Sequence, residues 1–215
     1  MLTTLLLALA LPLPPGPGLD TTQTFAGVMG QQYAWGVVGL QNGQVLRGFL
    51  PTNANGSTGV IPYYQPRPDG SRPRRPRALT TAEVQWMRVQ GQYSELLGKT
   101  KNDTGELAAR RATGALELFV VKSRPPLIVN FMGPTPVAGL PTTSAAPVFQ
   151  GLVSWYLRYS GDAATVRIEP AHFASQVPAF LQKDAELARR VAAGNEGYRF
   201  ADLESIVQQY NQRVK

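Results

Sequence analysis

Apolar and polar residues alternate with a period of two over much of the first 168 residues, which is typical of β-strands that bury one face. The clearest case is residues 33 to 37, which are followed by an apolar run at 45 to 50. Between them stands Asn42-Gly43, a pair that favours a tight β-hairpin turn because both turn positions need a positive φ. The pattern therefore predicts a hairpin here.

Further strands are predicted from shorter runs. They cover residues 59 to 64, 116 to 121, 149 to 159 and 165 to 168. Thr80 and Glu83 have the spacing of a capping box for a short helical turn. Residues 84 to 89 either extend that turn or form a strand with Val84, Trp86 and Arg88 on one face. The stretch from 125 to 147 is rich in Pro, Gly, Thr and Ala and interrupts the pattern, although residues 127 to 132 could pair within it.

From Pro170 the apolar spacing changes to that of helices. Phe173, Val177, Phe180 and Leu181 share one helical face, with Pro178 expected to kink the helix or to begin a new one. Residues 184 to 193 place acids before arginines, the order that a helix dipole favours, and Gly194-Asn195 ends that helix. Residues 201 to 213 carry the apolar stripe of a last helix.

These elements predict an α+β fold, mainly an antiparallel β-meander that is open-barrel or sandwich-like and is followed by two to three C-terminal helices. The expected organisation is a signal peptide at 1–18, a β-rich region at 24–169 with a Pro/Arg-rich loop at 65–77 and a Pro/Gly-rich loop at 133–147, and helices at 170–215 that pack on the same domain.

The first residues indicate export. An apolar run from Leu5 to Leu11 precedes a Pro/Gly-rich break, and the run is shorter than the roughly 20 residues that span a bilayer. Cleavage is expected between Ala10 and Gly18. The run lacks a preceding Lys or Arg, the first being Arg47, and the alternative is an apolar tail on a cytosolic protein. We expect a soluble mature protein in the periplasm or outer envelope, or secreted.

The chain resembles a group of exported bacterial proteins of unassigned function. The resemblance is carried by the segments VVGLQNGQVLRGFL, TTAEVQWMRVQGQYSEL, GALELFVV, SWYLRYSG and FLQKDAELARRVAAGNEGYRFADLESIVQQYN, and it covers residues 33 to 211. It implies export and the fold described above. It supplies no catalytic residues.

The net charge of +7 is concentrated in the middle of the chain, where residues 65 to 124 hold twelve Lys and Arg against six Asp and Glu. The prolines of the 65–77 loop favour an extended, solvated conformation. Its arginines are candidates for binding an anionic partner such as acidic polysaccharide or lipid headgroups, and the alternative is a merely solvated loop. Export argues against nucleic acid as a partner. The candidate residues are Arg67, Arg72, Arg74, Arg75 and Arg77, with Tyr63 and Tyr64 as an exposed contact beside them.

Catalytic and metal-binding motifs are sparse. The chain has no cysteine and one histidine, which excludes thiolate and multi-histidine metal sites. His172 follows Glu169 at a strand-to-helix junction, where a solvent-exposed turn position is favoured over a base role. For Glu117, in a predicted central strand, an edge or solvent-facing position is favoured. We assign no catalytic residue, metal or cofactor.

Three functions follow as hypotheses. The first is a non-enzymatic cell-envelope or secreted protein that binds another envelope component or has a structural role. The second is an envelope hydrolase whose carboxylates are brought together by the fold. The third is an anion-binding protein that uses the arginine-rich loop.

Overall fold

The computed structural model describes residues 22–27, 30–57, 59–66, 75–98, 105–123 and 152–214. Its described part contains eleven strands followed by three α-helices. The strands are β1 (Thr24–Ala26), β2 (Gln32–Leu40), β3 (Val45–Pro51), β4 (Val60–Tyr63), β5 (Arg77–Thr80), β6 (Val84–Val89), β7 (Gln92–Leu97), β8 (Glu106–Ala112), β9 (Leu116–Ser123), β10 (Leu152–Tyr159) and β11 (Val166–Ile168). The helices are α1 (Phe173–Phe180), α2 (Ala185–Ala192) and α3 (Leu203–Arg213), with single 3₁₀ turns at Pro170–His172 and Phe200–Asp202.

Nine strands form one twisted sheet. Eight of them follow the order β1-β2-β6-β7-β8-β9-β10-β11, and the ninth, β3, also pairs with β2. Strands β4 and β5 form a separate pair that touches this sheet through one antiparallel bridge between Phe49 and Tyr64. Every described pairing is antiparallel. The predicted α+β fold, an open meander followed by helices, is confirmed.

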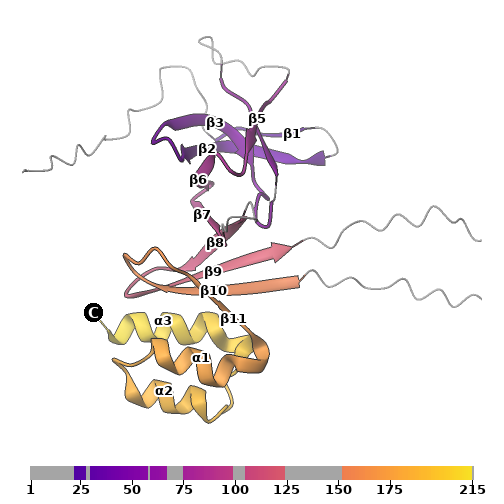
Figure 1. The fold of residues 1–215 in the computed structure, drawn as a ribbon. Coiled ribbons are helices and arrows are strands. Elements are labelled where there is room, and N and C mark those ends of the chain that lie inside the picture. The colour runs from indigo at the N-terminus through magenta and orange to yellow at the C-terminus, as the bar shows by residue number, and fades with distance from the viewer. Residues whose placement is uncertain are drawn as a thin grey trace, which may run out of the picture.

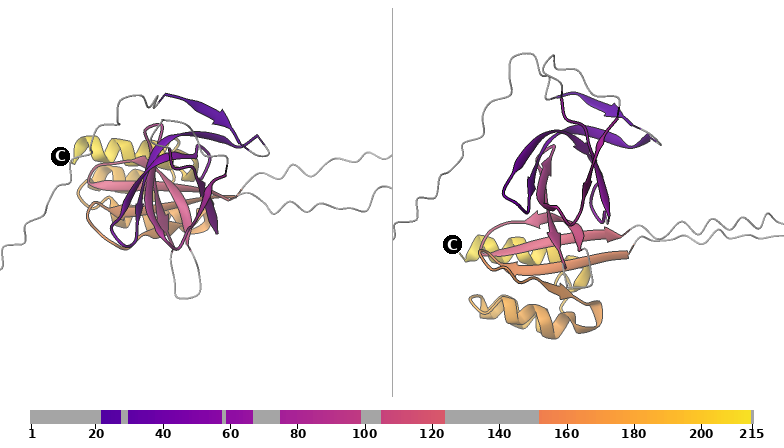
Figure 2. Two further views of the ribbon diagram at one scale, coloured as in Figure 1. Left: turned by 90° about the horizontal axis from the view of Figure 1, so that it is seen from above. Right: turned by 45° about the horizontal axis from the view of Figure 1, so that its top comes forward.

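The fold has two main apolar cores on different parts of this sheet (Figure 1). Strands β2 to β6 curl around the first core, whose fully buried members include Val38, Leu50 and Leu79. The second core lies between β8 to β11 and the three helices, where Leu118 and Val207 are fully buried. The curled strands therefore lie on one side of β9 and β10, and the helices lie on the other (Figure 2).

The predicted hairpin at residues 33 to 50 is confirmed as β2 and β3. Strand β2 pairs with β3 from Tyr33↔Pro51 to Gly39↔Val45. Gly43 has φ +83°, but Asn42 does not have the positive φ that was predicted for both turn positions. The Asn42 side chain instead accepts a hydrogen bond from the Gln44 backbone N–H at 3.0 Å, and the Gly43 N–H donates to the Leu40 carbonyl at 3.0 Å. The turn chemistry fixes the register, and the register decides which β3 side chains face the first core.

The capping-box residues form a strand connection instead of a helical turn. Glu83 accepts hydrogen bonds from the Thr80 backbone N–H and hydroxyl, both at 2.8 Å, but the chain then continues as β6. Pairing with β2 and β7 overrides the local helical preference. A register shift beside Leu40 means that Val84, Met87 and Val89 are the buried residues of β6.

The helices follow the predicted stripes. Phe173, Val177 and Leu181 are buried as expected, and α1 ends two residues after Pro178. Asp184 caps α2 by accepting a hydrogen bond from the Leu187 N–H at 3.0 Å. Predictions for residues 1–18 and 125–147, including pairing at 127–132, lie outside the described residues.

Candidate functional site

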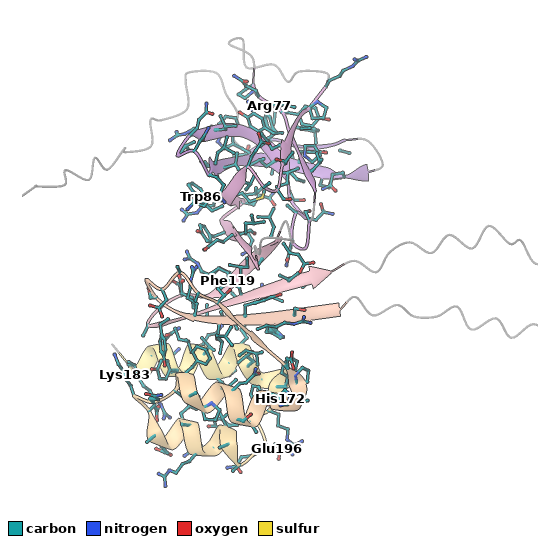
Figure 3. The ribbon with its side chains drawn as sticks, in the orientation of Figure 1. Arg77, Trp86, Phe119, His172, Lys183 and Glu196 are labelled. Carbon is teal, nitrogen blue, oxygen red and sulfur yellow. The ribbon has the colours of Figure 1, made fainter. Side chains whose placement is uncertain are left out.

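The predicted anion-binding loop lies only partly within the described residues. Arg67, Arg72 and Arg74 are outside them, whereas Arg75 and Arg77 are exposed. Arg77 begins β5 and lies at the end of the molecule opposite the helices (Figure 3). The structure therefore presents two of the five candidate arginines to solvent.

Tyr63 and Tyr64 require a correction, because neither is an exposed contact. Their exposed fractions are 2% and 5%. Tyr63 points into the first core, where burial raises the pKa of its phenol and the hydroxyl donates to the Arg47 carbonyl at 2.7 Å. Tyr64 packs edge-on against Tyr33, with ring centroids 5.0 Å apart. The neighbouring basic segment suggested solvent, but strand pairing places these rings in apolar clusters.

A different surface stands out where β3 and β4 separate. Phe49 and Tyr64 exchange two backbone hydrogen bonds of 3.0 Å each. In an antiparallel ladder the next hydrogen-bonded pair lies two residues further along each strand, which here would be Pro51 opposite Pro62. Neither proline has an N–H to donate, so the ladder cannot continue. The strands diverge, and a wide connection replaces a tight turn.

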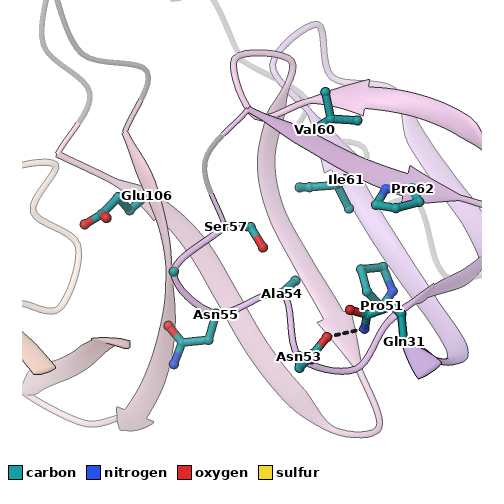
Figure 4. Close-up of a pocket in the computed structure, with 11 residues that line it drawn as sticks. Gln31, Pro51, Asn53, Ala54, Asn55, Ser57, Val60, Ile61, Pro62 and Glu106 are labelled. Carbon is teal, nitrogen blue, oxygen red and sulfur yellow. Dashed lines mark hydrogen bonds between the residues drawn. The ribbon is translucent and has the colours of Figure 1, made fainter. Parts of the chain in front are cut away.

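The space between the diverging strands is a cleft of about 420 Å³, which we call the proline cleft. Its walls come from the residue before β2, the end of β3, the β3–β4 connection, β4 and the first residue of β8. The lining residues are Gln31, Pro51, Asn53, Ala54, Asn55, Gly56, Ser57, Val60, Ile61, Pro62 and Glu106. Ala54, Ser57 and Ile61 point toward the middle, while Asn55 and Glu106 lie to one side (Figure 4).

The β3–β4 connection is tied to the rest of the sheet, which gives the cleft a fixed wall. Gly56 donates its N–H to the Leu107 carbonyl at 2.8 Å, and the Leu107 N–H donates to Ser57 at 3.4 Å. Asn55 Oδ1 accepts from the Lys122 N–H at 3.3 Å. These bonds hold the connection against β8 and β9, so the cleft is anchored to the central strands.

Side chains of the cleft offer amide and hydroxyl groups, together with one carboxylate, that of Glu106. Gln31 donates to Asn53 Oδ1 along one rim, a bond drawn in Figure 4. Within the described part of the chain, Asn53 Nδ2, Asn55 Nδ2 and the Ser57 hydroxyl make no hydrogen bond. Amide and hydroxyl groups can donate and accept together, which suits a ligand with the same double capacity.

The strand edges add backbone acceptors. The Thr52 N–H donates to the Gln32 carbonyl in the β2–β3 ladder, and the Thr81 N–H donates to the Gly59 carbonyl beside the β4–β5 ladder. Along each strand, successive residues alternately direct their backbone N–H and carbonyl toward the paired strand and away from it. By that alternation, the carbonyls of Pro51 and Pro62 and both backbone polar groups of Val60 are directed toward the cleft side. Three carbonyls and one N–H therefore face this space, so the backbone selects for a ligand that donates.

A buried ion network occupies the face of β7 to β10 that is turned away from the helices. The Arg158 guanidinium donates to Glu95 at 2.7 and 2.9 Å and to Glu117 at 2.7 and 2.9 Å. Glu117 also accepts from Arg110 at 2.8 Å. The side chains of Arg158 and Glu117 are only 11% and 8% exposed. The hydrogen bonds to Glu95 raise the pKa of Arg158 above its ordinary value, so it remains charged.

Glu117 is therefore buried, and the expectation of an edge or solvent-facing position is wrong. Its two arginine partners come from neighbouring strands, β8 and β10, and offset the cost of burying the carboxylate. Within the described residues, Glu95 and Glu117 are two carboxylates that the fold brings together, since both contact the same Arg158 nitrogen. In a glycosidase one of the pair must donate a proton, whereas both of these groups accept hydrogen bonds from guanidinium.

Tyr93 completes this network at its solvent side. Its hydroxyl donates to Glu95 at 3.2 Å, and the Arg110 guanidinium lies 4.2 Å from the ring centroid. Burial, followed by the charge of Glu95, raises the pKa of Tyr93 to about 12. The phenol is therefore a neutral hydrogen-bond donor at neutral pH.

His172 is exposed, as expected, and its Nε2 lies 3.9 Å from Glu169. Among the described residues, no group of three His, Cys, Asp or Glu could hold a metal ion. No helix in the described ranges is long and apolar enough to cross a membrane. Comparisons with protein-family models, with curated proteins and with solved structures find no match.

Sequence reasoning missed the proline cleft. Pro51 and Pro62 stand in apolar runs that read as ordinary strands, and Asn53, Asn55 and Ser57 look like generic loop residues. The usable signal was a proline at the end of one predicted strand and another inside the next, because proline occurs at strand edges whose N–H side is unpaired.

Proposed function

We propose that this chain is an exported, non-enzymatic binding protein of the cell envelope, or a secreted one, and that the proline cleft binds a neutral, hydroxyl-rich envelope component, meaning a glycan segment. The observation that carries the ligand class is the lining of the cleft. It combines amides, a hydroxyl, the Glu106 carboxylate and backbone carbonyls that strand pairing leaves available, and sugar hydroxyls can donate to both kinds of acceptor. Export is supported by the apolar run from Leu5 to Leu11 and the Pro/Gly-rich break that follows it.

Sugar hydroxyls fit this lining better than an added peptide strand does. A peptide that extends a sheet needs alternating donors and acceptors along the edge. Pro51 and Pro62 remove a donor from each edge of the cleft, so a peptide would find a broken ladder. Hydroxyl groups donate to carbonyls and accept from amides, and the apolar face of a sugar ring can rest on the exposed side chain of Val60.

The binding interpretation is favoured over the hydrolase by the state of the two adjacent carboxylates. Glu95 and Glu117 each accept hydrogen bonds from arginine. They also belong to a different surface from the cleft, whose lining includes neither of them. The volume of about 420 Å³ is within the range of about 300–1,000 Å³ that small-molecule sites occupy.

Binding is tested with neutral oligosaccharides released from the envelope of the native host. The variant Asn53→Ala/Ser57→Ala removes one amide and one hydroxyl from the cleft, and Asn195→Ala/Ser205→Ala removes the same groups from exposed positions among the helices. We expect the cleft variant to lose about tenfold or more in affinity, at about 1 kcal/mol per lost hydrogen bond, and the control to bind normally. Equal affinities in the three proteins would refute the site.

Export is tested separately by fractionating the native host and sequencing the N-terminus of the recovered protein. We expect it outside the cytosol, beginning between residues 11 and 19. Recovery from the cytosol with Met1 intact would overturn the localisation, and the binding experiment would then stand on its own.

A further inference from the structure

A second polar surface lies at the β6–β7 hairpin, away from the proline cleft. It is a shallow pocket of about 240 Å³. Its lining holds three arginines and no acidic residue: Arg88, Gly91, Gln92, Tyr93, Arg110, Arg111, Ala112 and Thr113. We propose that this pocket binds one anionic group, a phosphate, sulfate or carboxylate, through Arg88, Arg110 and Arg111.

The backbone brings these arginines together. Arg88 lies on β6 opposite Tyr93 of β7. Strand β8 pairs with β9 through Arg110 and then through Ala112, so Arg111 is an extra, bulged residue. A bulge redirects the side chains around it, and both Arg110 and Arg111 reach the pocket lining. Gln92 ties β7 to β8 here by donating to the Arg110 carbonyl at 3.0 Å.

Two of the guanidinium groups are held in position by ion pairs with carboxylates outside the pocket lining. Arg110 is bound by Glu117 at 2.8 Å and lies over the Tyr93 ring at 4.2 Å. Arg111 is bound by Glu204 of α3 at 3.2 Å. The acids therefore orient the arginines without lining the pocket themselves. Preorganised guanidinium groups lose little freedom when they bind an anion.

Arg88 supplies the uncompensated charge. Its guanidinium lies 6.0 Å from the Tyr93 ring centroid, on an exposed strand position. Within the described residues it forms no ion pair, whereas Arg110, Arg111 and Arg158 all do. An anion in the pocket would be the counter-charge for Arg88, and guanidinium binds phosphate, sulfate and carboxylate by paired N–H donors.

The test is a titration of the isotope-labelled full chain with inorganic phosphate at low ionic strength. Binding is monitored by the NMR chemical shifts of the backbone amides and the arginine side chains. The variant Arg88→Ser/Arg111→Ser removes two of the three guanidinium groups and leaves the partly exposed Arg110 in place. Arg167→Ser/Arg189→Ser removes the same charge from exposed positions elsewhere. We expect a loss of at least about tenfold in phosphate affinity for the first variant only, because bonds to charged groups are among the stronger ones.

The double variant could unfold because it loses the bond between Arg111 and Glu204. The single variant Arg88→Gln avoids this, because Arg88 forms no ion pair within the described residues. A fourth variant, Arg72→Ser/Arg74→Ser/Arg75→Ser/Arg77→Ser, measures the contribution of the arginine-rich loop to phosphate binding. Parallel titrations with vesicles of phosphatidylglycerol and phosphatidylcholine tell a lipid headgroup from a free anion. The proposal is overturned if Arg88→Gln binds phosphate as the native chain does, or if only the loop variant loses binding.

Discussion

Replacing Arg158 by methionine tests the buried ion network directly. Among the described residues, Arg158 is the only one that bonds both Glu95 and Glu117, and methionine leaves an unbranched apolar side chain in its place. Glu117 is left with Arg110 alone, and Glu95 keeps only the Tyr93 hydroxyl of the partners described for it. Breaking one side of a buried ion pair costs about 3–5 kcal/mol, because it strands a buried charge.

The structure places the expected loss at the lower end of that range. Arg110 still holds Glu117 at 2.8 Å, and the Glu95 side chain is 19% exposed and can recover some hydration. We therefore expect Arg158→Met to lower the free energy of unfolding by about 3 kcal/mol. Arg111→Met is the matched control, because Arg111 also binds one carboxylate through two nitrogens but is 45% exposed. Its cost should stay below about 1 kcal/mol.

The assay is urea unfolding at pH 7, followed by circular dichroism. With a urea dependence of about 2 kcal/mol per M, the two variants should differ by about 1 M in midpoint. The double variant Glu95→Leu/Arg158→Met should recover part of the loss, because it removes a buried charge together with its partner. Equal midpoints for Arg158→Met and Arg111→Met would refute the reasoning that burial makes this network matter.

Three further predictions concern other contacts. Asn211→Ala should cost about 3 kcal/mol and speed hydrogen exchange at Leu116, because Asn211 bonds both the N–H and the carbonyl of that buried residue at 2.8 and 2.7 Å. Above pH 10 the unfolded chain loses the Tyr93 proton while the folded chain keeps it up to about pH 12. Stability therefore falls as pH rises through this window, and Tyr93→Phe should flatten that fall in urea midpoints. Pro51→Val/Pro62→Val restores two backbone N–H donors, so we expect the ladder between β3 and β4 to close over the cleft. Hydrogen exchange should then show two new protected amides, and glycan binding should be lost. If these two amides stay unprotected, our account of the cleft is contradicted.

The sequence predicted those parts of the fold that local chemistry controls. Asn42-Gly43 sets one hairpin turn, and the stripe through Phe173, Val177 and Leu181 sets one helix face. These signals are short-range, so a single segment contains them. The Thr80 and Glu83 pair shows the limit, since its side-chain bond forms as predicted while cross-strand pairing turns the following residues into a strand.

The sites depend on contacts between distant segments, which no local pattern contains. Pro51 meets Pro62 only because the Phe49–Tyr64 bridge sets their register. Glu117 can be buried because Arg158, 41 residues away in the sequence, lies directly opposite it on the neighbouring strand. The prediction for Tyr63 and Tyr64 was wrong for the same reason. Their burial depends on packing against strands β1 to β3, which come earlier in the sequence than the basic segment that follows the two tyrosines.

The central claim, that the proline cleft binds a neutral glycan, is tested most directly by mapping where the ligand binds. Neutral oligosaccharides from the host envelope are titrated into the labelled chain, and amide shifts are followed by NMR. The account predicts saturable shifts at the Asn53 and Asn55 side-chain amides and at the Val60 backbone amide. Saturable binding that leaves these amides unmoved and shifts the Arg88 hairpin instead would contradict it.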